Sequence, residues 1–344
     1  MKENDNLRIK NPENTNNIFP QSQITEESVY RELACTVSIT EGGMTIRQVL
    51  KGRFGLVDHD ISRAKYRKDG IRLNGERTFV STMVKEGDLL IIRIEDEPEG
   101  RTVPSKGPIS ILYEDEDLIA LNKPAGIVVH PSHGHYADSL GNYLVGYYRR
   151  QGRRHDSRTI GRLDMETSGV ILYGKTRSSV SQMVRENENG LMGKAYLALA
   201  EGFFEKENYD FDGPIGRVEG EKLLRMVRED GDAAQTHVKV LKQYEDYALL
   251  YVTIETGRTH QIRVHLSHAG HPLLGDCLYG RVREDENGNT ITRAALHCYQ
   301  CYFQKLYTKE KVILRASLPE DMKAFIDEET LAQLGPYTPE RMEL

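Results

Sequence analysis

The chain has 344 residues, a formal net charge of −6 and 38% hydrophobic residues besides 30 glycines, which is typical of a globular protein large enough for two domains. No apolar run approaches the ~20 residues of a membrane-spanning helix, and the first thirty residues contain no apolar signal core. The 4 cysteines are too few and too scattered for a secreted disulfide framework, so we expect reduced thiols. Together with the lack of a long apolar run, this indicates a soluble, cytoplasmic protein. We also expect a monomer.

A small module is legible near the start of the chain. Thr45 is placed to cap a short helix that Gly52 ends, and Ser62 to cap a second helix that Gly70 ends. Asn74-Gly75 then marks a hairpin between two short apolar stretches. The pattern predicts two helices followed by a hairpin.

The same module is locally basic, although the whole chain is acidic. Residues 51–85 contain nine Lys or Arg against four Asp or Glu. Clustered cations displace counterions from phosphates, so the second helix predicts an RNA-binding face; a solvated helix face is the alternative. The candidate RNA-binding residues are Arg63, Lys65, Arg67 and Lys68.

A larger unit follows a stretch rich in Pro and Gly. Two strands are expected around residues 111–113 and 118–121, before a rigid Pro-Ala-Gly bend at residues 124–126. Asp164 then stands two residues after Arg162 and just ahead of a Thr-Ser-Gly turn and an apolar strand. Such a turn before a buried strand holds an acid at the edge of a cleft.

The remaining pattern predicts alternating strands and two helices. Residues 179–189 have helical spacing, and residues 194–199 alternate like a strand that carries Tyr196. After a strand over 248–255, Thr259 is placed to cap a second helix that Gly270 ends. Segments 295–303 and 311–318 complete the sheet.

Several of these stretches together resemble the RluA family of pseudouridine synthases. Arg162-Leu163-Asp164 followed by Thr167-Ser168-Gly169 is similar to its catalytic signature, with Gly161 where the family usually has His. Three further stretches fit the family in order: Asn122 to Pro131, Lys194-Ala195-Tyr196, and Thr256 to Leu266 with its continuation from Gly270 to Gly280. The N-terminal module resembles the S-four-like RNA-binding domain.

The resemblance implies an isomerase that converts uridines in RNA to pseudouridine without a cofactor or a metal. It assigns Asp164 as the catalytic carboxylate, Arg263 as its guanidinium partner, and Tyr196 as the residue that touches the target base. Arg162 takes the place of the flipped nucleotide. Further substrate-binding candidates are Lys123, Arg258, His260 and Gln261. Large-subunit ribosomal RNA is the favoured substrate and transfer RNA the next.

Other readings of the sequence remain open at this point. Asp164 and Glu166 share a face if their segment is extended, which is a feature of glycosidases. A non-catalytic RNA-binding protein is another possibility. Zinc sites are conceivable at Cys298-x-x-Cys301 or at His260, His265, His268 and His271. The cysteine pair has no second pair and looks more like part of an apolar strand, and the histidines lack the His-Glu-x-x-His spacing.

We therefore expect an α+β protein with an S-four-like αβ domain and a catalytic domain whose mixed, largely antiparallel sheet has a central cleft. The predicted parts are a flexible tail (1–29), the S-four-like domain (30–96), a linker (97–108), the catalytic domain (109–323) and a C-terminal tail (324–344).

Overall fold

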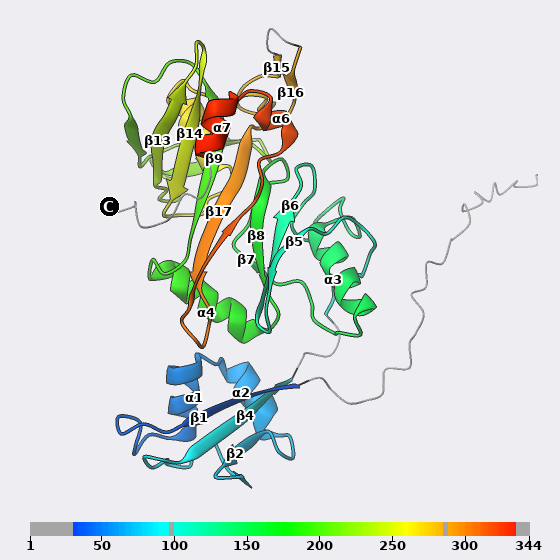
Figure 1. Cartoon of the computed structure of the whole chain (residues 1–344), viewed down its shortest axis with the longest axis vertical. Helices are drawn as coiled ribbons and strands as arrows, with labels where there is room; N and C mark the ends of the chain where they lie inside the picture. Colours follow the sequence, from blue (N-terminus) through cyan, green and yellow to red (C-terminus); the bar gives the residue numbers. More distant parts are fainter. Residues whose placement is uncertain (1–29, 96–99, 285–287, 335–344) are drawn as a thin grey trace, which may run out of the picture.

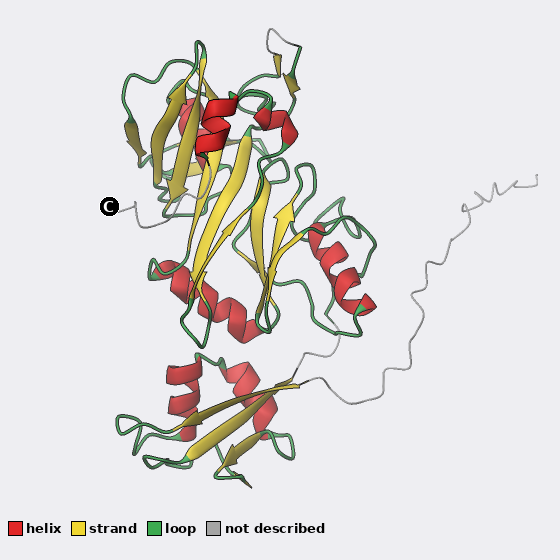
Figure 2. Cartoon of the chain, in the orientation of Figure 1, coloured by secondary structure: helices red, strands yellow, loops and turns green. Residues whose placement is uncertain are grey.

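The computed structural model describes residues 30–95, 100–284 and 288–334, so the expected N-terminal tail lies outside the described residues. Most of the described strands lie in two β-sheets, of four and ten strands (Figure 1). The smaller sheet lies at one end with two helices, and the larger one, with helices on both sides, makes up the rest (Figure 2). Each sheet has its own hydrophobic core.

The N-terminal sheet has the strand order β1-β4-β2-β3. Thr45 caps the first helix by accepting a hydrogen bond from the backbone N–H of Gln48, as predicted. That helix ends at Gly55, beyond the predicted Gly52. The elements are β1 (Tyr30–Thr36), α1 (Ile46–Phe54), α2 (Asp58–Lys65), β2 (Ile71–Leu73), β3 (Glu76–Arg77) and β4 (Leu89–Glu95).

The start of α2 differs from the prediction that Ser62 caps it. The helix begins at Asp58, with Val57 as a cap that has no side-chain hydrogen bond, so Ser62 lies inside it. The N–H of Val57 is instead bonded to the hydroxyl of Ser178, 3.3 Å away on the other half of the molecule. A cap satisfied by a distant residue leaves no local sequence signal.

The larger sheet is mixed, as expected. Its strands are β5 (Ile111–Glu114), β6 (Leu118–Lys123), β7 (Thr159–Ile160), β8 (Ser168–Gly174), β9 (Gly193–Glu201), β10 (Asn208–Phe211), β13 (Thr236–Gln243), β14 (Tyr247–Ile254), β17 (Leu296–Gln304) and β18 (Lys311–Arg315). The order is β10-β13-β14-β9-β17-β8-β6-β5, with β18 beside β17 and β7 beside β8. Among the described strands, β17 and β8 form a parallel pair and the other pairs are antiparallel.

Helices and two small hairpins surround this sheet. The helices are α3 (Leu140–Arg150), α4 (Arg177–Glu188), α5 (Gln261–His268), α6 (Glu320–Lys323) and α7 (Glu328–Gln333); the hairpins pair β11 (Ile215–Arg217) with β12 (Arg225–Val227) and β15 (Arg283–Glu284) with β16 (Thr290–Ile291). Cys298 and Cys301 are fully buried in β17, as the strand interpretation predicted. Within the described residues, every helix is too short or too polar to cross a bilayer.

The two halves contact each other through α4, which faces the N-terminal module in Figure 1. The buried hydroxyl of Ser178 donates to the carboxylate of Asp60. Arg185 donates from Nη2 to the carbonyl oxygen of Gly55 at 3.0 Å. Phe54 packs edge-on against Tyr307, with 6.0 Å between ring centroids. A buried polar bond and an aromatic contact therefore hold the module against the larger half.

The described part of the predicted linker lies along α3. The backbone N–H of Ser105 bonds to the carbonyl of Asn142 at 3.0 Å, and the side-chain amide of Asn142 donates to the carbonyl of Val103 at 2.7 Å. These bonds fix the path by which the chain enters the larger half.

Candidate active site

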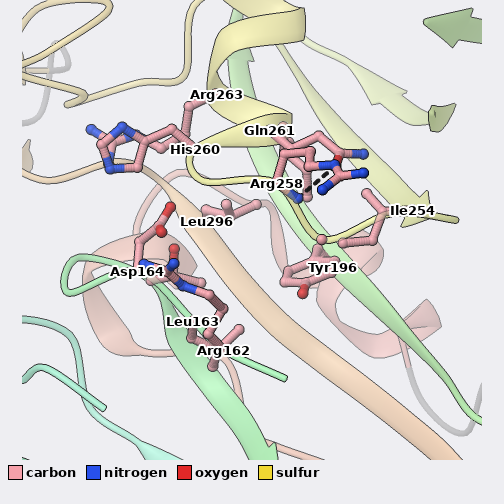
Figure 3. A pocket seen from close by; sticks show the side chains of 13 residues that line it. Arg162, Leu163, Asp164, Tyr196, Ile254, Arg258, His260, Gln261, Arg263 and Leu296 are labelled. Carbon is pink, nitrogen blue, oxygen red and sulfur yellow. Dashed lines mark hydrogen bonds between the residues drawn. The ribbon is translucent and has the colours of Figure 1, made fainter. Parts of the chain in front are cut away.

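An open pocket with about 420 Å³ of empty space lies between the loop that precedes β8, strand β9 and the start of α5 (Figure 3). Segments more than ninety residues apart in the sequence therefore meet at one place. Seven of the predicted site residues line it: Arg162, Asp164, Tyr196, Arg258, His260, Gln261 and Arg263.

The third position of the Thr-Ser-Gly turn requires glycine for steric reasons. Gly169 has φ 107°, a conformation that side chains rarely adopt, and a Cβ there would lie 2.2 Å from the carbonyl oxygen of Cys298. Beside it, the hydroxyl of Ser168 donates to Nδ1 of buried His297 at 2.9 Å. These contacts join β8 to β17 in parallel. The loop that carries Asp164 is thereby fixed at its downstream end.

Asp164 itself is half-buried at the pocket. Its carboxylate points toward the side of the pocket formed by His260 and Arg263 in Figure 3. The preceding residue, Leu163, is buried and anchors the loop in the main core. At the family's His position, Gly161 has φ 72°.

Lys123 lies beneath this loop rather than on the pocket wall. Its side chain is fully buried, and Nζ donates to the carbonyl oxygens of Pro124, Ile127 and Met165 at 2.9, 2.7 and 2.9 Å. Burial lowers the pKa of Lys123 to about 7, while the charge of Asp164 acts in the opposite direction. Three acceptors match the three N–H bonds of the ammonium form.

The Pro-Ala-Gly bend contributes to the same anchor. The backbone N–H of Gly126 donates to the carbonyl of Met165 at 2.9 Å, beside the bond from Lys123. The bend at the end of β6 and the residue after Asp164 are therefore fastened together, which explains why these two sequence elements occur in one site.

Arg263 is buried, with 2% of its surface exposed, and its ion pairs are with Asp276 and Glu166. Nε and Nη2 donate to the two oxygens of Asp276 at 2.6 Å each, and Nη2 lies 3.1 Å from Oε2 of Glu166. Burial disfavours its charge, yet Asp276 and Glu166 leave the pKa of Arg263 raised. Within the described chain, no ion pair joins Arg263 directly to Asp164.

The carboxylate of Glu166 is therefore bound outside the pocket that Asp164 lines. Its carboxylate binds Arg263 and accepts from the backbone N–H of Ala294 at 3.4 Å. It is not among the residues that line the pocket with Asp164. The two carboxylates do not form the facing pair that a glycosidase requires.

Tyr196 forms part of the pocket wall from β9. Its side chain is 4% exposed, and its backbone pairs with Val252 on one side and Cys298 on the other. Burial, followed by the nearby Cys298 and Asp164, raises the pKa of Tyr196 well above 10. The residue therefore presents a neutral phenol to the pocket over the physiological pH range.

The start of α5 differs from the prediction that Thr259 caps it. His260 is the cap residue, in the left-handed region with φ 59°, and it makes no side-chain cap bond. Gln261 stabilises the loop instead: its Oε1 accepts from the N–H of Arg258 at 3.0 Å and from the hydroxyl of Thr256 at 2.8 Å. Residues 261–266 are all buried, so this part of the helix has no solvent-exposed face.

His260 and Arg162 form the more open part of the site. Nδ1 of His260 is 2.8 Å from the hydroxyl of Tyr279, and burial lowers the pKa of His260 against the opposing effect of Asp164. Arg162 is exposed and reaches across to Oγ1 of Thr259 at 3.5 Å. Arg258 is also exposed and donates to the carbonyl of Ala233 at 3.0 Å.

Asp276 and Tyr279 were not assigned a role from the sequence, although both fall in a stretch that fits the family pattern. Asp276 is fully buried, and Oδ1 also accepts from the backbone N–H groups of Leu278 and Tyr279 at 2.9 and 3.1 Å. The ring of Tyr279 lies 5.2 Å from the guanidinium carbon of Arg263. A fully bonded carboxylate and an aromatic ring thus hold that guanidinium.

The four predicted RNA-binding residues are not part of the pocket. They lie in the second half of α2 and the turn after it, where Arg63 and Lys65 are half-buried and Arg67 and Lys68 are exposed. The ammonium of Lys65 lies 4.7 Å from the ring centre of exposed Tyr66.

Comparisons with known proteins agree with this architecture. Residues 117–268 match the family model of RNA pseudouridylate synthases. The chain is 36% identical over 284 residues to the uncharacterized RNA pseudouridine synthase YjbO of Bacillus subtilis, covering 82% of this chain and 98% of that one. It belongs to the RNA pseudouridylate synthase family. The enzyme is an isomerase of the RluA group, as its motifs predicted.

One further relative and one solved structure are also similar to this chain. Ribosomal large subunit pseudouridine synthase D of Haemophilus influenzae is 31% identical, over 84% of this chain and 92% of that one. The solved structure of human RNA pseudouridylate synthase domain containing 1 has a TM-score of 0.51 and 22% identity, covering 69% of this chain and 96% of that one. The structural match supports the fold of this synthase.

Proposed function

We propose that this synthase converts specific uridines of large-subunit ribosomal RNA to pseudouridine, with Asp164 as the catalytic carboxylate. The observation that carries the proposal is the position of Asp164: half-buried in an open pocket, opposite a buried tyrosine and within reach of several cations. In the reaction the bond between uracil N1 and ribose C1′ breaks, the base turns, and C5 bonds to C1′. The proton on C5 leaves and N1 gains one, so no atom is lost.

Asp164 acts either at the ribose or at the uracil ring in this scheme. Its surroundings suit a carboxylate that forms and then breaks a bond, because Lys123 and Arg263 place positive charge near the charged form. Both cations are held by other acceptors in the free enzyme; Lys123 lies beneath the loop, whereas Arg263 lines the pocket.

Tyr196 supplies a face on which the target uracil stacks. Its ring is part of the pocket wall, and its raised pKa makes it a hydrogen-bond donor rather than a general base. Stacking of a base on an aromatic side chain contributes roughly 1–3 kcal/mol, which offsets much of the cost of turning a nucleotide out of its stack. Arg162, exposed at the rim, takes the place that the nucleotide leaves.

The N-terminal module binds RNA outside the pocket. Two observations support this role. The second half of α2 and the turn after it are basic, with exposed Arg67 and Lys68, and the exposed ring of Tyr66 lies beside Lys65. Ribosomal RNA is favoured as the substrate because the similar Haemophilus protein is named for the large ribosomal subunit.

The test is site-by-site mapping of pseudouridine in ribosomal and transfer RNA from a strain lacking the enzyme, after incubation with purified protein. The wild type should form pseudouridine in large-subunit RNA. Asp164→Asn, which keeps the side-chain shape, should lower the rate at least ~10²–10⁴-fold with RNA affinity retained. Pseudouridine formed in transfer RNA alone would change the assigned substrate to transfer RNA. RNA binding without any pseudouridine would indicate a non-catalytic RNA-binding protein. An active Asp164→Asn variant would remove Asp164 from the mechanism.

A further inference from the structure

The loop after Asp164 is tied down at each of its next three residues. The carbonyl of Met165 accepts from Lys123 and Gly126, both at 2.9 Å. The carbonyl of Glu166 accepts from Nη1 of Arg293 at 3.2 Å, and the N–H of Thr167 returns to the carbonyl of Asp164 at 3.2 Å. Among these residues Glu166 also uses its side chain as an anchor, through its ion pair with Arg263.

The group that Glu166 binds is itself immobile. Arg263 is held by two 2.6 Å bonds to Asp276, whose side chain is fully buried and accepts two further backbone N–H groups. A bidentate pair of this kind fixes both the position and the plane of the guanidinium. Glu166 thus links the Asp164 loop to helix α5, whose first six residues are buried.

The pairing also leaves one corner of the guanidinium for the pocket. Asp276 uses Nε and Nη2, and Glu166 shares Nη2. In the described chain Nη1 has no hydrogen-bond partner and is not a buried unsatisfied atom, while Arg263 lines the pocket. The two carboxylates thus occupy Nε and Nη2 and leave Nη1 without a protein hydrogen bond in a residue that lines the pocket.

We propose that Glu166 is a positioning residue of the isomerisation: its ion pair with Arg263 holds the Asp164 loop at the distance from α5 that the reaction requires. This inference rests on the proposed role of Asp164. Glu166 does not line the pocket, so it acts on substrate through the loop and through Arg263. A misplacement of about 1 Å at a reacting group is enough to lower a rate ~10²-fold.

The test compares Glu166→Gln with Glu166→Asp under steady-state conditions on the mapped RNA substrate. Glu166→Gln keeps the side-chain length and removes the charge, and should lower kcat at least tenfold. KM and the thermal midpoint should stay close to those of the wild type, since RNA contacts and core packing are unchanged. Glu166→Asp keeps the charge and should recover part of the lost kcat.

The matched control is Glu201→Gln, which neutralises a partly buried carboxylate in an ion pair of similar length, 3.2 Å from Nε of exposed Arg281. It should keep the wild-type kcat. A wild-type kcat in Glu166→Gln would overturn the proposal. So would a lower kcat in Glu166→Gln that is accompanied by a lower thermal midpoint and is not restored in Glu166→Asp. If Asp164→Asn is inactive while Glu166→Gln is fully active, only this inference fails; an active Asp164→Asn removes the proposed function as well.

Discussion

His297 is the residue whose environment makes the clearest prediction about pH. It is 1% exposed at the junction of β17 and β8, where Nδ1 accepts from Ser168 and Nε2 donates to the carbonyl of Ala316 at 3.2 Å. Burial lowers the pKa of His297 from 6.5 to about 4, so the folded protein keeps it neutral while the unfolded chain binds a proton below pH 6.5. Stability should therefore fall as pH decreases from about 6.5 to 4.

The expected loss between pH 7 and pH 4.5 is about 2 kcal/mol from this group. Urea unfolding of the wild type and of His297→Gln at both pH values measures it: the difference between the two pH values should be smaller in the variant by that amount. His133→Gln, in an exposed loop, is the control. An equal pH difference in the wild type and His297→Gln would contradict the prediction.

At the scale of single residues, sequence motifs located the pocket better than they assigned contacts. The stretches around Asp164, Tyr196 and Arg263 meet in one pocket, as the family pattern implied. The partner of Arg263 was not predictable, because Asp276 and Glu166 compete with Asp164 for one guanidinium and only side-chain packing decides among them. For Lys123 the resemblance implied a contact with substrate, whereas its buried ammonium donates to backbone carbonyls.

At the scale of elements, strand β6 ends in Lys123, the residue that supports the Asp164 loop. Lys123→Met replaces the ammonium by an apolar group of similar length. The carbonyls of Pro124 and Ile127 then lose the bonds they receive from it, while that of Met165 keeps the bond from Gly126. These bonds are part-buried, and an unmet buried polar group costs about 1–3 kcal/mol, so we expect a loss of roughly 2 kcal/mol in the free energy of unfolding.

The measurement is chemical denaturation, with Lys311→Met at the exposed start of β18 as the control, which should change stability by less than ~0.5 kcal/mol. The turnover of folded Lys123→Met should also fall, because its loop loses an anchor. Wild-type stability in Lys123→Met would show that the three carbonyls do not depend on this side chain.

The accuracy of element prediction followed the regularity of the pattern. Strands β9, β14 and β17 alternate or run apolar and were placed within two residues of their observed ends. The first residues of α2 and α5 were missed, since the cap of α2 is bonded by Ser178 and the loop before α5 is held by Gln261. Tertiary bonds replaced the local capping signals on which a sequence prediction depends.

At the scale of the whole molecule, the contact between the two halves was not predictable from the sequence, because it joins residues more than a hundred positions apart. Ser178 accepts from Val57 and donates to Asp60, so one buried hydroxyl serves both chain segments. With Arg185 on Gly55, these bonds hold the basic module in a defined orientation to the pocket. An RNA that contacts both the basic module and the pocket would thus be bound at two sites a fixed distance apart.

Gly55 tests how firmly the halves are joined. It has φ 61°, and a Cβ there would lie 2.7 Å from side-chain atoms of both Gln182 and Arg185. Gly55→Ala should displace these side chains, weaken the bond from Arg185, and let the module separate from α4. Small-angle X-ray scattering should then show a larger radius of gyration. RNA affinity should fall severalfold while kcat at saturating RNA is retained, because the pocket itself is untouched.

Gly43→Ala is the matched control, since Gly43 also has positive φ, 85°, but a Cβ there would meet nothing within 4 Å. Both variants carry the backbone strain of an alanine in this region, about 1 kcal/mol, and only Gly55→Ala adds the collision with α4. A larger radius in Gly55→Ala alone would assign the change to the interface. Equal radii in both variants and the wild type would mean that the halves stay together without this close approach, and that Ser178 and Tyr307 suffice to hold them.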